Sequence, residues 1–234
     1  MRTPNFGEGT NVILGVSWIH QLSDNYVAGL GASYQIKSEY QPLSGYTDKY
    51  KPANEISVTG GIDIKLSETQ TLTGDIMSVF FGNDKVNGNE VFSSGNTTVV
   101  DAVYKQYFGF NGLTAVLLYN IISEKYFEDN MFSNNITSSI ESLKLNPNKL
   151  YMGVNFNQRF SYKYSLNYGI FLSLFEKTAS FFSDYTLYGF SINPNIKVSS
   201  ELSIPVILKY SRGSAPNKPD ISSFNFAAGI NILF

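Results

Sequence analysis

Charged residues are sparse in this chain, so those that fall inside apolar segments are the first candidates for chemistry. Asp63, Asp75 and Lys105 lie in three consecutive segments of alternating apolar residues, on the side opposite the apolar side chains. Charges that leave water need partners. We therefore predict that these three meet as a salt-bridge network, and the alternative is a contact site for a polar solute.

Three further cations, Lys65, Arg159 and Lys197, each stand close to a tight turn. A ring of such cations at the mouth of a passage would select anionic or polar solutes. The alternative is that each long side chain simply extends past apolar surface to reach water.

Few residues are candidates for a catalytic or metal-binding role. His20 is the only histidine, and it stands near the end of an alternating segment without the Ser or Asp partner that a nucleophile–base pair requires. The chain has no Cys, so no Cys/His cluster with zinc-ligand spacing exists. We expect no catalytic residue, no metal site, no cofactor and no enzymatic activity.

Composition narrows the classes of protein further. Only 15% of residues are charged, against roughly 25% in average soluble domains. Aromatic residues also make up 15%, mean hydropathy is −0.09, and no apolar run is long enough for a membrane helix. The net charge of −2 gives no sign of a nucleic-acid partner. The first residues lack the apolar stretch of a secretory signal, so we expect that a signal was removed or that the chain continues upstream.

The elements that position these residues are alternating segments. Apolar side chains recur at every second residue, which is typical of strands with one apolar face. In the segment 26–37, Tyr26, Leu30 and Tyr34 share the apolar face, whereas Gly29, Gly31 and Ser33 share the other. The eleven predicted strands are 11–21, 26–37, 55–66, 71–81, 98–110, 113–122, 150–160, 164–175, 185–198, 202–210 and 222–234. Pro205 removes a backbone donor, so we expect a bulge or weakened pairing there.

The connections between these strands alternate in length. Tight turns are predicted at 23–25, 67–70, 111–112, 161–163 and 199–201, with Asn111-Gly112 as favoured hairpin chemistry. Long polar connections are predicted at 38–54, 82–97, 123–149, 176–184 and 211–221. Short turns at one end and long loops at the other are typical of outer-membrane barrels, in which the short turns face the periplasm and the long loops the exterior.

Aromatic residues lie near both ends of the predicted strands, as in the belts that flank the apolar band of a membrane barrel. Trp18, Tyr26, Phe110, Phe160, Tyr164 and Phe234 flank the short turns. Tyr34, Phe80, Tyr119, Tyr188, Tyr210 and Phe224 lie near the long loops. The alternative is the aromatic interior of a soluble barrel.

The last residues carry a family resemblance. Phe224, Phe226, Ala228, Ile230, Ile232 and Phe234 fall on one face of the final strand. The ending Ala-Gly-Ile-Asn-Ile-Leu-Phe at 228–234 resembles the C-terminal assembly signal of bacterial outer-membrane β-barrels, departing from it at Ile232, where many barrels carry an aromatic residue. The resemblance implies that the barrel-assembly machinery binds 224–234 and that outer-membrane lipid surrounds the protein. A weaker similarity extends to transporter-like barrels of aromatic-compound degradation pathways.

Together these features predict an all-β fold, a single up-and-down antiparallel transmembrane barrel domain over 1–234. Single-chain barrels normally have an even strand number with both termini periplasmic. Eleven strands place the N-terminus outside, so we expect about twelve strands, one of them upstream, and either an unpaired edge or direct closure between the first and last strands.

The side chains opposite the apolar faces would line the interior of such a barrel. The predicted pore-lining residues are Asp63, Asp75, Asp101, Lys105, Asn155, Asn157, Asn193, Asn195 and Lys209, and the predicted periplasmic mouth is Lys65, Arg159 and Lys197. Small, amide-bearing and apolar positions together favour a narrow passive channel for small neutral or partly hydrophobic solutes. The alternatives are an interior packed shut, or a barrel that acts through its extracellular loops, such as 38–54.

Overall fold

The computed structural model of the chain describes residues 10–41, 47–123, 125–127, 142–143, 147–178 and 183–232. Strands and turns make up its regular structure, and within these ranges no helix is long and apolar enough to span a membrane. The all-β class expected from the sequence is confirmed.

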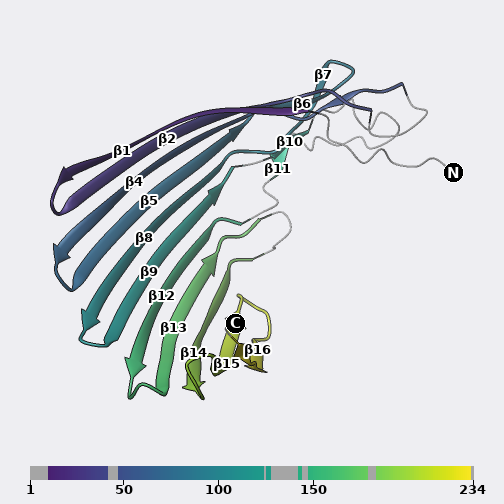
Figure 1. The fold of residues 1–234 in the computed structure, drawn as a ribbon. Helices are drawn as coiled ribbons and strands as arrows, with labels where there is room; N and C mark the ends of the chain where they lie inside the picture. Colours follow the sequence, from purple (N-terminus) through teal and green to yellow (C-terminus); the bar gives the residue numbers. More distant parts are fainter. Residues whose placement is uncertain are drawn as a thin grey trace.

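One large antiparallel sheet contains every strand that the alternation predicts (Figure 1). Each strand pairs with the next predicted strand along the chain, which is the up-and-down order. In spatial order the sheet contains β1 (Asn11–Ser23), β2 (Tyr26–Lys37), β4 (Glu55–Ser67), β5 (Gln70–Phe81), β8 (Thr97–Phe108), β9 (Asn111–Ile122), β12 (Lys149–Arg159), β13 (Tyr164–Phe175), β14 (Tyr185–Lys197), β15 (Leu202–Ser214) and, last, β16 (Ile221–Ala228) continued by β17 (Asn231–Ile232).

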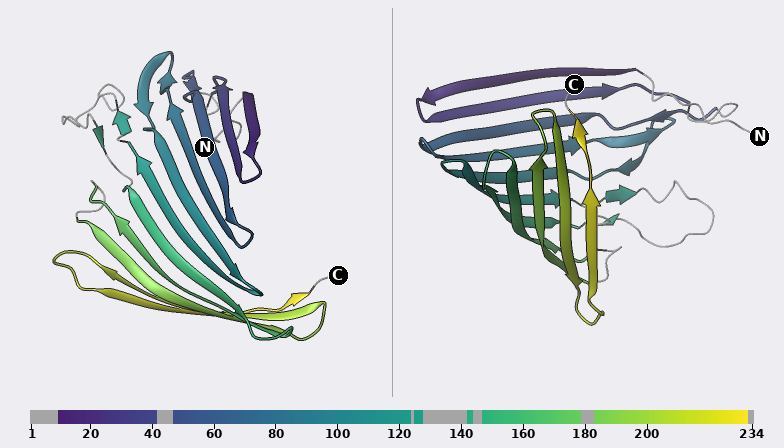
Figure 2. Two further views of the ribbon diagram at one scale, coloured as in Figure 1. Left: turned by 90° about the vertical axis from the view of Figure 1, so that its left-hand side faces the viewer. Right: turned by 60° about the horizontal axis from the view of Figure 1, so that its bottom comes forward.

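The sheet curves strongly, and its first and last strands stand apart as two edges (Figure 2). Within the described residues β1 pairs with β2 alone, and β16 and β17 pair with β15 alone. These are unpaired edges of the kind that the odd strand count led us to expect. The additional upstream strand stays a prediction.

The apolar face of the curved sheet is its exposed, outer face. Along β2 and β13 the apolar side chains alternate with more covered ones, and Leu30 and Ile170 are 63% and 66% exposed. Within the described residues the buried apolar side chains are only Ala53 and Val91. A soluble sheet would bury such a face under a second layer, because exposed apolar area costs roughly 25 cal/mol per Å² in water. The outer face therefore requires an apolar medium.

Two local predictions are decided by backbone geometry. The hairpin between β8 and β9 turns at Gly109 and Phe110, not at Asn111-Gly112, because Phe108 already pairs with Asn111. Gly109 has a φ of 61°, which suits the glycine-first turn of a two-residue hairpin. At Pro205 the expected weakening is confirmed, since β16 ends at Ala228 and pairing resumes only at Asn231.

A second, smaller sheet forms within connections that the sequence predicted only as loops. This cap sheet has the order β11-β10-β7-β6-β3 and lies at the end of the main sheet that carries the long connections (Figure 1). Its strands are β3 (Tyr50–Lys51), β6 (Asn83–Val86), β7 (Asn89–Ser93), β10 (Lys125–Phe127) and β11 (Ser142–Leu143). Asn87 and Gly88 both have positive φ, 51° and 85°, as a two-residue Asn-Gly hairpin requires.

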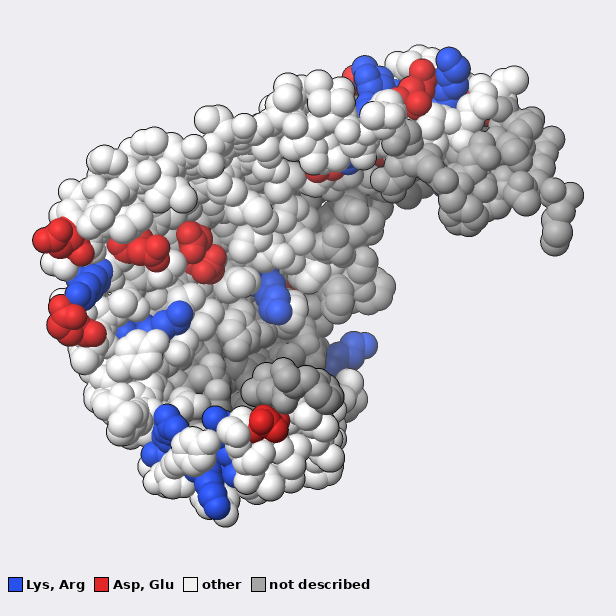
Figure 3. Space-filling model, viewed as in Figure 1, with Lys and Arg blue, Asp and Glu red and all other residues white. Residues whose placement is uncertain are grey.

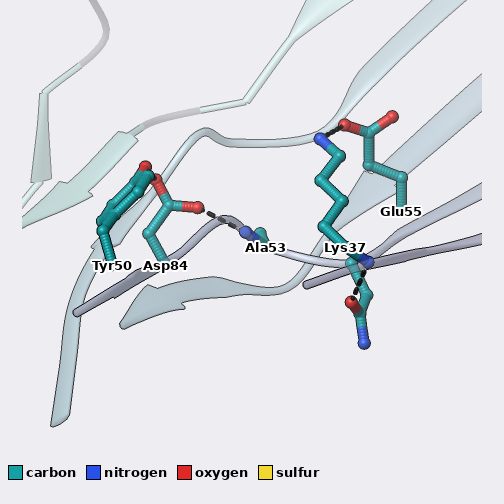
Figure 4. Close-up of polar contacts among 6 residues, drawn as sticks. Lys37, Tyr50, Ala53, Glu55 and Asp84 are labelled. Carbon is teal, nitrogen blue, oxygen red and sulfur yellow. Dashed lines mark hydrogen bonds and ion pairs between the residues drawn. The ribbon is translucent and has the colours of Figure 1, made fainter. Parts of the chain in front are cut away.

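A buried carboxylate joins two strands of this cap sheet and the connection that leads into β4 (Figure 4). Asp84 of β6 accepts a hydrogen bond from the Tyr50 hydroxyl and another, of 2.6 Å, from the Ala53 amide. Nearby, Lys37 at the end of β2 forms an ion pair with Glu55 at the start of β4. Asp84 therefore ties β6 to β3 and to Ala53, in the connection just before β4.

Candidate solute passage

All twelve predicted lining and mouth residues lie on one face of the main sheet. The register decides this, because cross-strand partners point to the same side and alternate residues share a side. Asp63 pairs with Thr73, Asp75 with Asp101, and Asn155 with Gly169, so one face runs continuously across the strands. This inner face is hollowed, with acidic side chains toward the upper left and basic ones toward the bottom in Figure 3.

One half of the inner face, which we call the acidic wall, carries Asp63, Asp75 and Asp101 on β4, β5 and β8. All three line a hollow of about 550 Å³. Asp63 accepts a 2.7 Å hydrogen bond from the Thr73 hydroxyl, and Asp75 lies directly across from Asp101. Several residues that line this hollow are glycines, including Gly29, Gly31 and Gly61. The hollow exists because these residues have no side chain to fill it.

The predicted network of Asp63, Asp75 and Lys105 does not form. Within the described residues Lys105 makes no ion pair with any carboxylate of the acidic wall. The register explains this, because Lys105 lies across from Thr71, whereas Asp75 lies two rows further along the strands. The acidic wall therefore presents its carboxylates to the hollow without a neutralising lysine.

The other half, which we call the basic wall, carries Lys149 and Lys209 on β12 and β15 beside two aromatic rings. Lys209 Nζ lies 4.8 Å from the centre of the Phe171 ring, and Lys149 Nζ lies 5.9 Å from that of Tyr151. The two rings are nearly parallel with centroids 6.5 Å apart. These groups line a second hollow of about 570 Å³.

Asparagine side chains occupy the part of the basic wall nearer the short turns. Asn157 pairs with Asn167, and Asn167 pairs with Asn193 on the next strand. The Oδ1 atoms of Asn167, Asn193 and Asn195 are buried and have no hydrogen-bond partner within the structure. Buried polar atoms normally find a donor, so these positions are suited to water or to a solute that donates hydrogen bonds.

The predicted mouth residues all stand at the short-turn end, each with a local partner. Lys65 forms a 2.6 Å ion pair with Glu68. Arg159 lies over the Phe110 ring at 5.8 Å, and Lys197 lies over the Tyr162 ring at 5.3 Å. Their role in selecting solutes stays a prediction.

The aromatic residues near the strand ends lie on the exposed side of the sheet. Trp18, Tyr26, Phe160 and Tyr164 at the short-turn end are all exposed, as are Tyr34, Phe80, Tyr188 and Phe224 toward the other end. Phe234, the remaining terminal aromatic, lies outside the described residues. His20 stacks on Trp18 with ring centroids 5.4 Å apart.

Sequence reasoning missed two groups that shape the basic wall. The sequence pattern predicts Lys149 within the long connection 123–149, whereas in the structure it begins β12 and lies over the rings of Tyr151 and Phe175. Tyr151 shares the parity of Asn155 and Asn157 along β12, so period-two counting from those asparagines could have placed it on the inner face.

Comparison with known proteins gives solved structures only. No family model and no curated protein matches the chain. The chain is similar to the NanC porin, with 9% identity and a TM-score of 0.43 over 100% of this chain and 96% of that one. An outer membrane channel from Pseudomonas putida F1 matches with 11% identity and a TM-score of 0.43, over 94% and 82%. The translocator domain of the autotransporter NalP from Neisseria meningitidis matches with 15% identity and a TM-score of 0.37, over 96% and 80%.

Proposed function

We propose that this protein is an outer-membrane β-barrel that acts as a narrow passive channel for small neutral or partly hydrophobic solutes. The observation that carries the proposal is the inverted sheet: its apolar side chains are exposed on the outer face, and its charged and amide side chains line the hollows of the inner face. Alternation of this kind, apolar toward lipid and polar toward the interior, characterises membrane barrels.

The two walls support the choice of solute. One wall carries carboxylates and the other carries ammonium groups, so a passage enclosed by both has no single sign of charge. Such a passage disfavours strong selection for ions of one sign and suits solutes that are neutral or carry both charges. The rings of Tyr151 and Phe171 add surface for an apolar part of the solute.

In the proposed orientation the short turns face the periplasm, and the long connections with the cap sheet face the exterior. Exposed aromatic side chains at both ends support two membrane interfaces. The terminal segment 224–234 would direct assembly into the outer membrane.

Electrical recording from the purified protein in a planar lipid bilayer tests the channel. We expect small, steady conductance steps, together with the heat-dependent change in gel mobility that folded barrels show. A heat-modifiable barrel that never conducts ions and never passes small neutral solutes into vesicles would refute the proposal.

The cap sheet favours a second candidate, a barrel that binds a partner through its outer end. Its strands are held by hydrogen bonds to buried Asp84. Replacing Asp84 with Ala should loosen the cap sheet without altering the main sheet. A partner that dissociates from this variant, in a protein that does not conduct, would favour the second candidate.

A further inference from the structure

Two prolines interrupt the hydrogen-bond ladder on either side of one strand. Pro194 in β14 and Pro205 in β15 are the only prolines within the described strands. Between β14 and β15, the pair Ile192–Leu208 is followed next by Asn195–Pro205, and the intervening residues form no regular pairs. On its other side β15 loses pairing where β16 ends and β17 has not begun.

The direction of each backbone group explains both interruptions. The Gly229 amide donates to the Pro205 carbonyl at 3.1 Å, so Pro205 faces β16. Because N–H and C=O of one residue point to the same neighbour and alternate along a strand, Val206 and Leu208 face β14. Pro194 must then face Val206, and it has no N–H to donate to the Val206 carbonyl. Strand β15 therefore loses one backbone hydrogen bond to each neighbour: its own Pro205 has no donor toward β16, and Pro194 of β14 has no donor toward Val206.

Two hollows lie near this interruption: an outer groove over β12, β13 and β14, and an inner hollow that extends to β15. The outer groove, about 680 Å³, is lined mainly by apolar side chains, among them Phe156, Tyr168, Ile170, Phe190 and Ile192. The inner hollow of the basic wall reaches Asn193, Ile207 and Lys209. Gly169, Ile170 and Ser191 border both hollows, so only the thickness of the sheet separates them.

Near the interruption, the inner hollow is lined by an apolar side chain next to a cation. Ile207 points inward and is 48% exposed, with Ala227 across from it on β16. Lys209, two residues further along β15, supplies an ammonium group to the same hollow. A cation next to apolar surface, with a lipid-facing apolar groove on the opposite face of β14, matches a molecule with an anionic head and an apolar tail.

We propose that the interface between β14 and β15 is a lateral passage between the interior and the bilayer, and that its occupant is a single-chain anionic amphiphile such as a long-chain carboxylic acid. The carboxylate contacts Lys209, with Lys149 as the second cation of the hollow, and the chain leaves between Pro194 and Val206 toward Ile192. This passage rests on the proposed membrane barrel but does not depend on ion conduction.

A reversible cross-link across the interface tests the passage directly. The chain has no native Cys, so Asn193→Cys with Ile207→Cys places two thiols on the inner face at the interruption. The control is Ser57→Cys with Val79→Cys, an inner-face pair in the uninterrupted ladder of β4 and β5. The probe is a long-chain carboxylic acid with a photoreactive diazirine in its tail, added to the protein in lipid nanodiscs.

We expect the oxidised Asn193/Ile207 variant to lose photolabelling around Ile192 and Val206, and reduction to restore it. The oxidised control should label like the unmodified protein. Equal labelling of the cross-linked and reduced forms would overturn the passage. Conductance is recorded on the same samples. A protein that is photolabelled but never conducts would refute the proposed channel and leave the lateral passage standing. A protein that conducts but is not photolabelled would refute the lateral passage alone.

Two single substitutions test separately the contact with the carboxylate and the path of the alkyl chain. Lys209→Gln should weaken binding of the carboxylic acid roughly tenfold or more, because a charge-assisted contact is lost, and should leave the matching long-chain alcohol unaffected. Pro194→Ala restores the missing donor and should reduce labelling by both probes, whereas Pro216→Ala, in the connection after β15, should not. Unchanged carboxylic acid binding in Lys209→Gln would contradict the assigned occupant.

Discussion

The acidic and basic walls are built from the same alternation of side chains, yet they differ in what covers their glycines. In the acidic wall the Asp75 carboxylate lies against Gly61. In the basic wall an aromatic ring lies there instead, with Tyr151 over Gly153 and Tyr185 over Gly213. Glycine thus makes room for a charge on one wall and for a ring on the other.

The walls also differ in the continuity of their backbone pairing. Between β4 and β5 every residue from Glu55 to Lys65 has a cross-strand partner, whereas the ladder between β14 and β15 is interrupted at Pro194. A continuous ladder gives a rigid wall, and a missing donor lowers the cost of local separation. The comparison indicates that the acidic wall is the fixed side of the interior and the basic wall the adaptable one.

The largest expected effect tests the premise that the outer face of the sheet contacts lipid behind both walls. Leu30→Arg on β2 and Ile170→Arg on β13 should each lower the free energy of unfolding by about 2–4 kcal/mol, because both side chains lie on the apolar outer face. Thr186→Arg, at the end of β14 near the long connections, should cost only about 0–1 kcal/mol. The measurement is urea unfolding in vesicles. An arginine tolerated at either of the first two positions would show that its side of the sheet does not contact hydrocarbon.

The difference in pairing predicts unequal amide exchange. One missing backbone hydrogen bond is worth about 0.5–1.5 kcal/mol, so the amides of Val206 and Ile192 should exchange roughly 2- to 12-fold faster than those of Val58 and Ser78. Hydrogen–deuterium exchange in micelles measures this. Equal protection in the two regions would remove the distinction between a fixed and an adaptable wall.

The difference in charge predicts opposite shifts in ion preference. Asp75→Asn with Asp101→Asn should move permeability toward anions, and Lys149→Gln with Lys209→Gln should move it toward cations. Each shift should be roughly two- to fivefold, because a charge a few ångströms from a passing ion contributes at most about 1 kcal/mol in water. Reversal potentials under a salt gradient measure the ratio, with Lys163→Gln, in a short turn, as control. Shifts of the same sign would show that the two walls do not line one passage.

The smallest expected effect concerns pH at the end of the basic wall that carries the long connections. A hydrogen bond from Arg212 holds the pKa of Asp220 below its ordinary value. The ionised carboxylate therefore contributes stability at neutral pH, and this contribution is lost as the pH falls through the lowered pKa. The thermal midpoint of Asp220→Asn should lie slightly below that of the unmodified protein at pH 7 and should match it in strong acid. A difference that persists in strong acid would point to packing and not to charge.

The strands of the main sheet were predictable because each spans a bilayer-sized length with strict period-two alternation. Strand β2 shows this, since Tyr26 to Lys37 was assigned with both ends correct. The cap sheet was missed because its strands are only two to five residues long, too short for a period to show. Its one clear signal was Asn87-Gly88 between Val86 and Asn89, a hairpin turn inside a segment read as a loop.

The inner face was predictable as a set of residues but not as a set of contacts. Parity along each strand places Asp75 and Lys105 on one side, whereas their relative height depends on how β5 pairs with β8. That register is fixed across the connection 82–96, which contains strands of its own, so counting residues from the nearest turn could not give it.

The rings that lie over glycines in the basic wall also constrain how this sequence can evolve. A side chain added at Gly153 would meet the Tyr151 hydroxyl at 2.6 Å, and one at Gly213 would meet Tyr185. Neither glycine can change unless its aromatic neighbour moves or shrinks in the same step. In related chains, a larger residue at position 153 or 213 should therefore occur together with a shifted ring or a smaller side chain at position 151 or 185.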